Sequence, residues 1–107
     1  MFDEKYPEVD PNKKSANEVW ESRYAVPGYL FGKEPILTLK SFVQNLKTGK
    51  VLDVAMGEGR NAVFLASNGF QVEGIDCSGK GVAKAKALAD EKKVSIEAKT
   101  QNLDFQY

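Results

Sequence analysis

The chain has 107 residues and a mass of 11.8 kDa, which matches one ordinary domain and excludes a two-domain enzyme. Hydrophobic residues make up 42% and charged residues 28%, so collagen-like, low-complexity and wholly disordered chains are excluded. Fifteen basic and fifteen acidic side chains balance, which argues against nucleic acid or an anionic membrane as a partner. There is no histidine and only one cysteine, so a metal site, a catalytic triad and a disulfide scaffold are all disfavoured.

The first 14 residues differ in composition from the rest of the chain. Residues 1–14 are polar and include Pro7 and Pro11, which predicts a flexible arm followed by one domain over residues 15–107. The arm lacks the basic start and apolar run of a secretory signal, and no segment approaches the roughly 18 apolar residues of a membrane span. We therefore expect a cytoplasmic protein.

Two helices are expected before the first strand. Ser15 and Glu18 form a capping-box signature for a short helix that ends near Pro27. Pro35 suits the first position of a second helix, which Gly49 would end. The apolar face of this second helix would comprise Ile36, Leu39, Val43 and Leu46.

Strands and helices then alternate. Residues 51–56 form a nearly continuous apolar run, which predicts a central parallel strand covered on both faces. The elements expected after it are a helix over 62–67, a strand over 70–75, a helix over 78–92 and an edge strand over 94–98. We expect the 78–92 helix to turn its lysines to solvent and to bury Val82, Ala85, Leu88 and Ala89. This order predicts an α/β fold, a three-layer Rossmann-like parallel sheet that stops after its third strand.

The turn GEGRN, at the end of the first predicted strand, is the most informative stretch. Gly57 and Gly59 let the backbone turn sharply and let a ligand approach without meeting a Cβ. Asp76 ends the second strand, seventeen residues after Gly59, where a carboxylate commonly accepts hydrogen bonds from ribose hydroxyls. A ligand that contains a nucleoside is therefore expected.

The charged residues near the glycine turn help to decide which nucleoside-containing cofactor would bind there. The spacing G-x-G-x-x-A at 57–62 also fits the dinucleotide fingerprint, so a dinucleotide-binding fragment is an alternative. Glu58 and Asp53 would set carboxylates against a pyrophosphate, which disfavours NAD. In S-adenosylmethionine, by contrast, Asp53 can receive the ammonium, directly or through water, while backbone amides and Arg60 can bind the carboxylate. The acidic residues therefore favour S-adenosylmethionine.

These motifs resemble a known family. VLDVAMGEGRN followed by VEGIDCS closely resembles the class I S-adenosylmethionine-dependent methyltransferases, and GEGRNAVFLASNGF is similar to their tellurite-resistance and thiopurine-methyltransferase-like branch. The upstream W-x-x-R-Y and Y-L-F-G-x-x-P are similar to that branch too, and the resemblance covers residues 20–107. It implies the cofactor-binding, amino-terminal half of a methyltransferase for a small-molecule, soft acceptor such as a thiol or a metalloid oxyanion.

The resemblance also implies site residues. The methionine side of the pocket would be formed by Asp53, Gly57 and Gly59. Ribose and adenine would be held by Asp76, Cys77, Asn102 and Leu103, with Asp104 as an alternative to Asn102. The segment over residues 20–35, called the leader below, would close over the cofactor through Tyr24, Tyr29 and Phe31. Plainer interpretations stay open, because the glycines could only make a turn, Asp76 could cap a helix, Cys77 could be inert and the aromatic residues could be packing.

The length of the chain suggests a second hypothesis. A complete sheet of this kind needs roughly 200 residues, so we expect the chain to be incomplete for catalysis on its own. Its first strand would have an unpaired edge and exposed apolar faces, which predicts a homo-oligomer or a complementing partner chain. A non-catalytic, self-associating binding module of methyltransferase ancestry is therefore the alternative from another functional class.

Overall fold

The computed structural model describes residues 15–102. The elements in chain order are α1 (Ala16–Tyr24), α2 (Leu37–Phe42), the 3-10 helix η1 (Val43–Asn45), β1 (Lys50–Val54), α3 (Arg60–Ser67), β2 (Gln71–Asp76), α4 (Gly79–Glu91) and β3 (Glu97–Thr100). The arm expected over residues 1–14, and Leu103 and Asp104, lie outside the described residues. Within residues 15–102, none of the helices has the length and apolar run that crossing a membrane requires.

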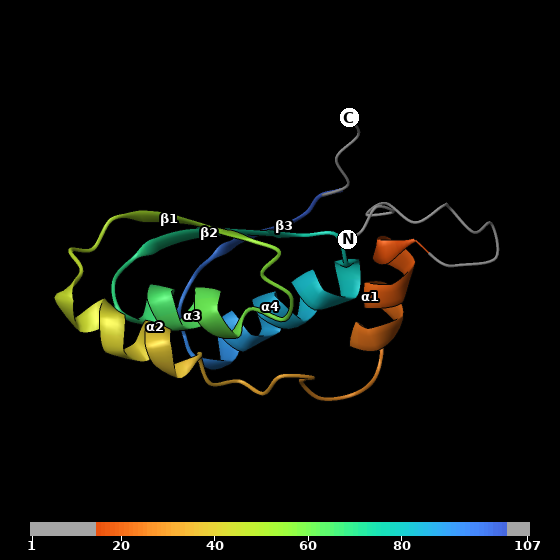
Figure 1. Cartoon of the computed structure of the whole chain (residues 1–107), viewed down its shortest axis with the longest axis horizontal. Coiled ribbons are helices and arrows are strands. Elements are labelled where there is room, and N and C mark those ends of the chain that lie inside the picture. The colour runs from red at the N-terminus through yellow and green to blue at the C-terminus, as the bar shows by residue number, and fades with distance from the viewer. Residues whose placement is uncertain (1–14, 103–107) are drawn as a thin grey trace, which may run out of the picture.

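The three strands form one parallel sheet in the order β1-β2-β3. Val51 of β1 pairs with Val72 of β2, and Gly74 pairs with Ala98 of β3. Figure 1 shows α2, α3 and α4 on one side of the strands, with α1 beside the N-terminal end of α4. The α/β class and the parallel Rossmann-like sheet are confirmed, and the described residues supply two of the three expected layers.

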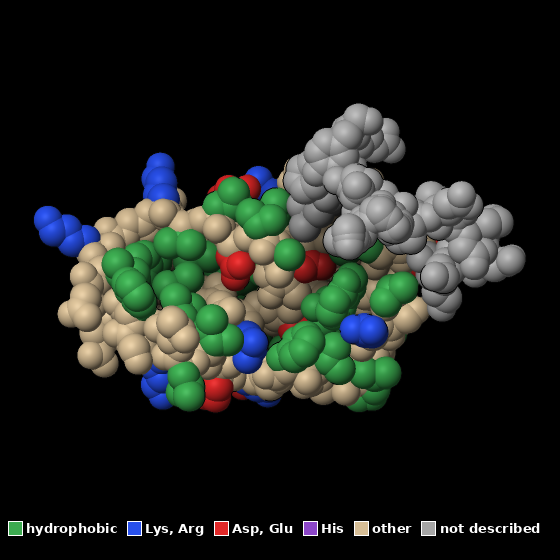
Figure 2. All heavy atoms as spheres, viewed as in Figure 1, with side chains coloured by type: hydrophobic (Ala, Val, Ile, Leu, Met, Phe, Trp, Pro, Cys, Tyr) green, Lys and Arg blue, Asp and Glu red, His purple; other side chains and the backbone are tan. Residues whose placement is uncertain are grey.

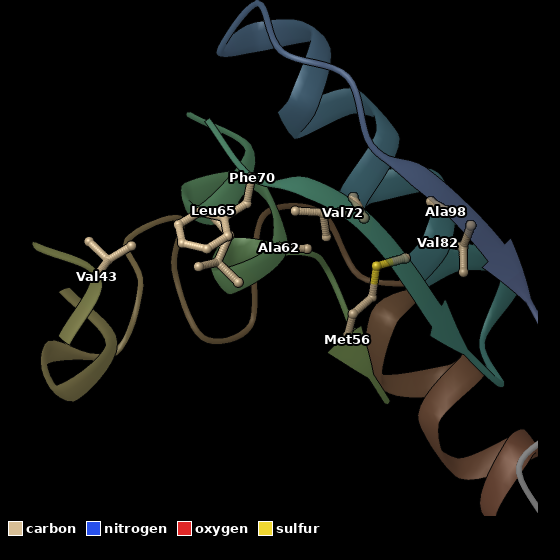
Figure 3. Packing of buried hydrophobic residues seen from close by; sticks show 9 residues of the cluster. Val43, Met56, Ala62, Leu65, Phe70, Val72, Val82 and Ala98 are labelled. Atoms are coloured by element: carbon tan, nitrogen blue, oxygen red, sulfur yellow. The ribbon is translucent and has the colours of Figure 1, made fainter. Parts of the chain in front are cut away.

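The core lies between the sheet and these helices. Figure 3 shows its main cluster, to which β1, α3, β2, α4 and β3 or their adjoining turns contribute Met56, Ala62, Leu65, Phe70, Val72, Val82 and Ala98. A smaller cluster joins Val63 to Leu88 and Ala89. The inward positions predicted for α4 are confirmed, because Val82, Ala85, Leu88 and Ala89 are all buried.

Two serine caps fix where helices begin. The Ser15 hydroxyl accepts from the Glu18 N–H at 3.2 Å, and the Glu18 carboxylate accepts from the Ser15 N–H at 2.9 Å, so the predicted capping box is confirmed. Ser78 caps α4 in the same manner by accepting from the Gly81 N–H at 3.0 Å. Both caps follow from residue type and spacing alone.

The second helix was predicted too long. Instead of running from Pro35 to Gly49, α2 covers six residues, and η1 follows it. Only part of the predicted apolar face packs, since Val43 is buried while Ile36 and Leu46 are 43% and 46% exposed. The chain becomes extended at Leu46 because it must straighten before it enters β1.

The expectation that the first strand is covered on both faces was wrong for the described residues. Val51 packs against the core, but Leu52 and Val54 are 57% and 55% exposed because their side chains point away from the helices. β1 also stands at the edge of the three-stranded sheet rather than at its centre. The unpaired edge and exposed apolar face predicted for this strand are therefore present in residues 15–102.

Candidate functional site

β1 passes into α3 through a compact turn over residues 55–59. The Met56 N–H donates to the Ile75 carbonyl at 3.0 Å, and the Gly59 N–H donates to the Met56 carbonyl at 3.1 Å. Ala55, Gly57 and Gly59 all have positive φ angles, of 59°, 61° and 86°. Glycine adopts this left-handed conformation without steric cost, whereas Ala55 adopts it with strain.

Neighbouring segments of the protein occupy the room beside the two glycines. A Cβ on Gly57 would lie 2.7 Å from the Tyr24 hydroxyl oxygen, and a Cβ on Gly59 would lie 2.6 Å from the Ala85 Cβ. The absent side chains therefore let the leader and α4 approach the turn. This is a packing reason for both glycines, beside the ligand-approach reason inferred from the sequence.

The Asp76 carboxylate joins the end of β2 to the glycine turn. Its Oδ2 accepts from the Gly57 N–H at 2.7 Å, and its Oδ1 accepts from the Ser78 N–H at 2.9 Å. The residue is 5% exposed. Each carboxylate oxygen has a second lone pair, so Asp76 can accept further hydrogen bonds from ligand hydroxyls.

Buried ionisable groups surround this turn. Burial raises the pKa of Tyr24 to about 12, and the carboxylates of Asp76 and Glu58 add to that shift. Burial also raises the pKa of Asp53, with a smaller contribution from the negative charge of Asp76. The ring of Tyr24 stacks on Trp20 with 5.4 Å between centroids. An aromatic and acidic environment therefore forms beside the strand ends.

A pocket of about 450 Å³ opens at this place, and Figure 2 shows the hollow on the face seen in Figure 1. The predicted residues that line it are Tyr24, Phe31, Gly57, Arg60, Asp76 and Cys77. The predicted residues that do not line it are Tyr29, Asp53, Gly59 and Asn102. The lining residues that sequence analysis did not assign to the site are Ala16, Asn17, Trp20, Gly32, Ala55, Met56, Glu58 and Asn61.

Some of these residues could have been found from the sequence. Ala55, Met56 and Glu58 lie inside the very turn that the motif identified, so their place at the pocket follows from adjacency. Ala16 and Asn17 belong to the first turn of α1, and nothing in their residue types indicated a place at the strand ends.

Contacts between the leader and α4 place Tyr29 and Lys84. The Tyr29 hydroxyl donates to the Lys84 carbonyl at 2.9 Å, away from the pocket. The Lys84 side chain, expected to face solvent, is only 20% exposed because its ammonium lies 3.1 Å from a carboxylate oxygen of Glu58. The Arg60 guanidinium lies over the Phe31 ring, 5.7 Å from its centroid.

Comparison with known proteins identifies the family. Residues 35–106 match the family model described as tellurite resistance protein TehB. A methyltransferase-named protein of Geobacillus sp. (strain WCH70) is 40% identical over 81 residues, which span 69% of this chain and 33% of that protein.

Solved structures agree with this assignment at the level of the fold. The crystal structure of TehB from Haemophilus influenzae matches 80% of this chain and 28% of its own length, with a TM-score of 0.57 and 17% identity. An S-adenosylmethionine-dependent methyltransferase from Geobacter sulfurreducens, solved with S-adenosyl-L-homocysteine, matches 78% of this chain and 33% of its own, with a TM-score of 0.55 and 25% identity. The chain thus spans about a third of the length of these proteins. Since the family model covers more than half of the sequence, the chain belongs to the TehB family, within the methyltransferase branch that its motifs resemble.

Proposed function

We propose that this chain binds S-adenosylmethionine in the 450 Å³ pocket and forms the cofactor-binding part of a small-molecule methyltransferase. One observation carries the proposal: Gly57 and Asp76, at the carboxyl ends of two parallel strands, line one pocket together with aromatic residues of the leader. The volume suits a ligand of this size. The Geobacter sulfurreducens methyltransferase, which shares the fold, was solved with S-adenosyl-L-homocysteine.

The pocket offers a partner for each part of the cofactor. Asp76 would accept hydrogen bonds from the ribose hydroxyls, and Arg60 would bind the carboxylate. The rings of Trp20 and Phe31 offer flat apolar surface for adenine and π-electron faces that attract a sulfonium cation, and Tyr24, stacked on Trp20, lines the pocket beside them. Cys77 would lie against adenine. Asn102 and Leu103 stay part of the proposed adenine edge, and Asp53 would reach the ammonium through water.

The proposed reaction is methyl transfer to a soft acceptor, a thiolate or a metalloid oxyanion. The cofactor supplies a methyl group on a positively charged sulfur. As the acceptor's lone pair forms the new bond to carbon, the electrons of the breaking carbon–sulfur bond stay on sulfur, and its charge is lost. The protein's task is then to orient the acceptor and exclude water. Such acceptors need little base catalysis, which suits a chain without histidine.

Calorimetry with S-adenosylmethionine and S-adenosylhomocysteine tests the cofactor proposal. Asp76→Asn should weaken binding by about tenfold to a hundredfold, because a charged hydrogen bond contributes about 1.5 to 3 kcal/mol. Asp90→Asn, the same change at an exposed position of α4, is the matched control and should leave binding unaltered. A folded chain that gives heat with neither compound would overturn the proposal, and heat with NAD instead would favour a dinucleotide-binding fragment.

The exposed side of β1 supports a second candidate, a self-associating module that binds the cofactor without transferring methyl groups. Leu52 and Val54 are each more than half exposed, and β1 stands at the edge of the described sheet. Light scattering should then report a dimer or larger species. A monomer would remove this candidate, and methyl transfer to a thiol or a metalloid oxyanion would favour the first.

A further inference from the structure

Lys84 and Glu58 form a largely buried ion pair beside the pocket. Lys84 lies on α4, and Glu58 lies between the two glycines of the turn after β1. The Lys84 Nζ is 3.1 Å from Glu58 Oε2, with the two side chains 20% and 4% exposed. A buried carboxylate is stable only when it is paired and hydrogen-bonded, so Glu58 depends on Lys84.

Both members of the pair also hold the leader. The Lys84 ammonium donates to the carbonyls of Val26 and Gly28, each at 2.6 Å. Glu58 Oε1 accepts from the Leu30 N–H at 2.7 Å. Three backbone groups of residues 26–30 are thus bound by one ion pair, which connects the leader to α4 and to the glycine turn at once.

The same leader segment has little packing of its own. Leu30 is 44% exposed and Phe31 55%, and a Cβ on Gly28 or Gly32 would meet nothing within 4 Å. Tyr29 is the member of this segment that packs against the Val63, Leu88 and Ala89 cluster. Polar contacts with the ion pair are therefore a main source of order in residues 26–32.

The ordered leader forms part of the pocket wall. Phe31 and Gly32, directly after the Leu30 amide that Glu58 binds, line the pocket, as does Arg60, which lies over the Phe31 ring. Glu58 also borders the pocket, but its two oxygens are engaged by Leu30 and Lys84. Its contacts therefore suit a structural role toward the wall better than a direct role toward a ligand.

We infer that Glu58 and Lys84 are positioning residues: their ion pair latches the leader onto the glycine turn and so completes the wall of the cofactor pocket. This inference rests on the proposed function for the identity of the ligand. The latch itself is a property of the chain without ligand, and it can be measured separately.

The test uses the full chain with Lys84→Met, Glu58→Gln, the double variant and Lys84→Arg. Lys86→Met, at an exposed lysine of the same helix, is the matched control. Circular dichroism establishes that each variant is folded. Amide hydrogen exchange over residues 26–32 is measured without ligand, and the dissociation constant of S-adenosylhomocysteine is measured by calorimetry.

We expect Lys84→Met to speed exchange of residues 26–32 by about tenfold or more and to weaken binding by a similar factor, while Lys86→Met changes neither. Glu58→Gln should have the smaller effect, because glutamine can still accept from the Leu30 amide and Lys84 keeps two carbonyl acceptors. The double variant should be no worse than Lys84→Met, since the pair acts as a unit. Lys84→Arg should restore much of both readouts, because it keeps the charge and the donors.

Two results would overturn the latch. The first is unchanged exchange of residues 26–32 in folded Lys84→Met and Glu58→Gln, and it counts whether or not a ligand binds. The second is faster exchange with unaltered affinity, which would show that the ordered leader does not serve binding. Absence of binding by the parent chain would instead overturn the proposed function, while the exchange experiment would still decide the latch.

Discussion

The apolar residues of β2 and β3 on the helix side of the sheet and those of β1 on its other side lie in opposite environments. On the helix side, Val72 and Ala98 are 4% and 9% exposed, while on the other side Leu52 and Val54 are more than half exposed. Both crossovers, through α3 and α4, run in the same direction across the sheet, and right-handed crossovers then place both helices on one face. In β1, which has apolar residues on both faces, residue type therefore does not reveal which face is covered, because the path of the chain decides it.

The largest expected effect compares the same substitution on the two sides. Leu88→Ala should lower the free energy of unfolding by about 2 to 5 kcal/mol, because Leu88 is fully buried and truncation leaves a cavity. Leu52→Ala should change it by no more than about 0.5 kcal/mol. Urea denaturation at low protein concentration measures both. A large cost at Leu52 would mean that the outer face is covered in solution, as in a self-associated chain.

Alanine substitutions at Gly59 and Gly28, whose φ angles are nearly equal, separate the cost of overpacking from the cost of backbone strain. Gly59→Ala should lower the free energy of unfolding by about 2 to 4 kcal/mol, because it combines left-handed strain with overpacking against Ala85. Gly28→Ala, with φ of 85° and open space around it, should show the strain alone, about 1 to 2 kcal/mol. Equal costs at both positions in denaturant titrations would contradict the tight approach of α4 to the turn.

The pH dependence of the free energy of unfolding tests whether Tyr24 is buried. The pKa of Tyr24 is raised from its ordinary value of 10 to about 12 by burial, so the folded state holds this proton more tightly than the unfolded state. The stability contribution is complete below pH 10 and is lost as the pH rises from 10 to 12. The free energy of unfolding should therefore fall more steeply across that range in the parent chain than in Tyr24→Phe. Parallel curves would show that Tyr24 is not buried in solution.

The smallest expected effect is a stabilisation at the turn itself. Ala55 has a φ of 59°, which strains any residue that carries a Cβ. Ala55→Gly should raise the free energy of unfolding by up to about 1 kcal/mol, because relief of strain is partly offset by the greater freedom of glycine in the unfolded chain. Thermal unfolding can detect it. A loss of stability would mean that the alanine methyl packs more favourably than the strain costs.

Much of the fold could be predicted because its signals are local. Ser15 and Ser78 cap helices through hydrogen bonds to residues three positions away, and hydrophobic periodicity placed α4 and its buried side correctly. The second helix was predicted too long because periodicity does not show where the chain must straighten to enter a strand. Coverage of β1 on both faces was predicted from a run of apolar residues, which is also compatible with an open face.

The candidate site likewise combines features that local sequence predicts with contacts that only the tertiary structure shows. From sequence alone came the alternation of strands and helices, the glycine turn after β1 and an acidic residue at the end of β2, because each depends on residue types within one short segment. Only the tertiary structure placed Tyr24 against Gly57, paired Lys84 with Glu58 across 26 positions and brought the first turn of α1 to the pocket. Those contacts join segments that are distant in the chain, so they depend on how the helices pack rather than on any local preference.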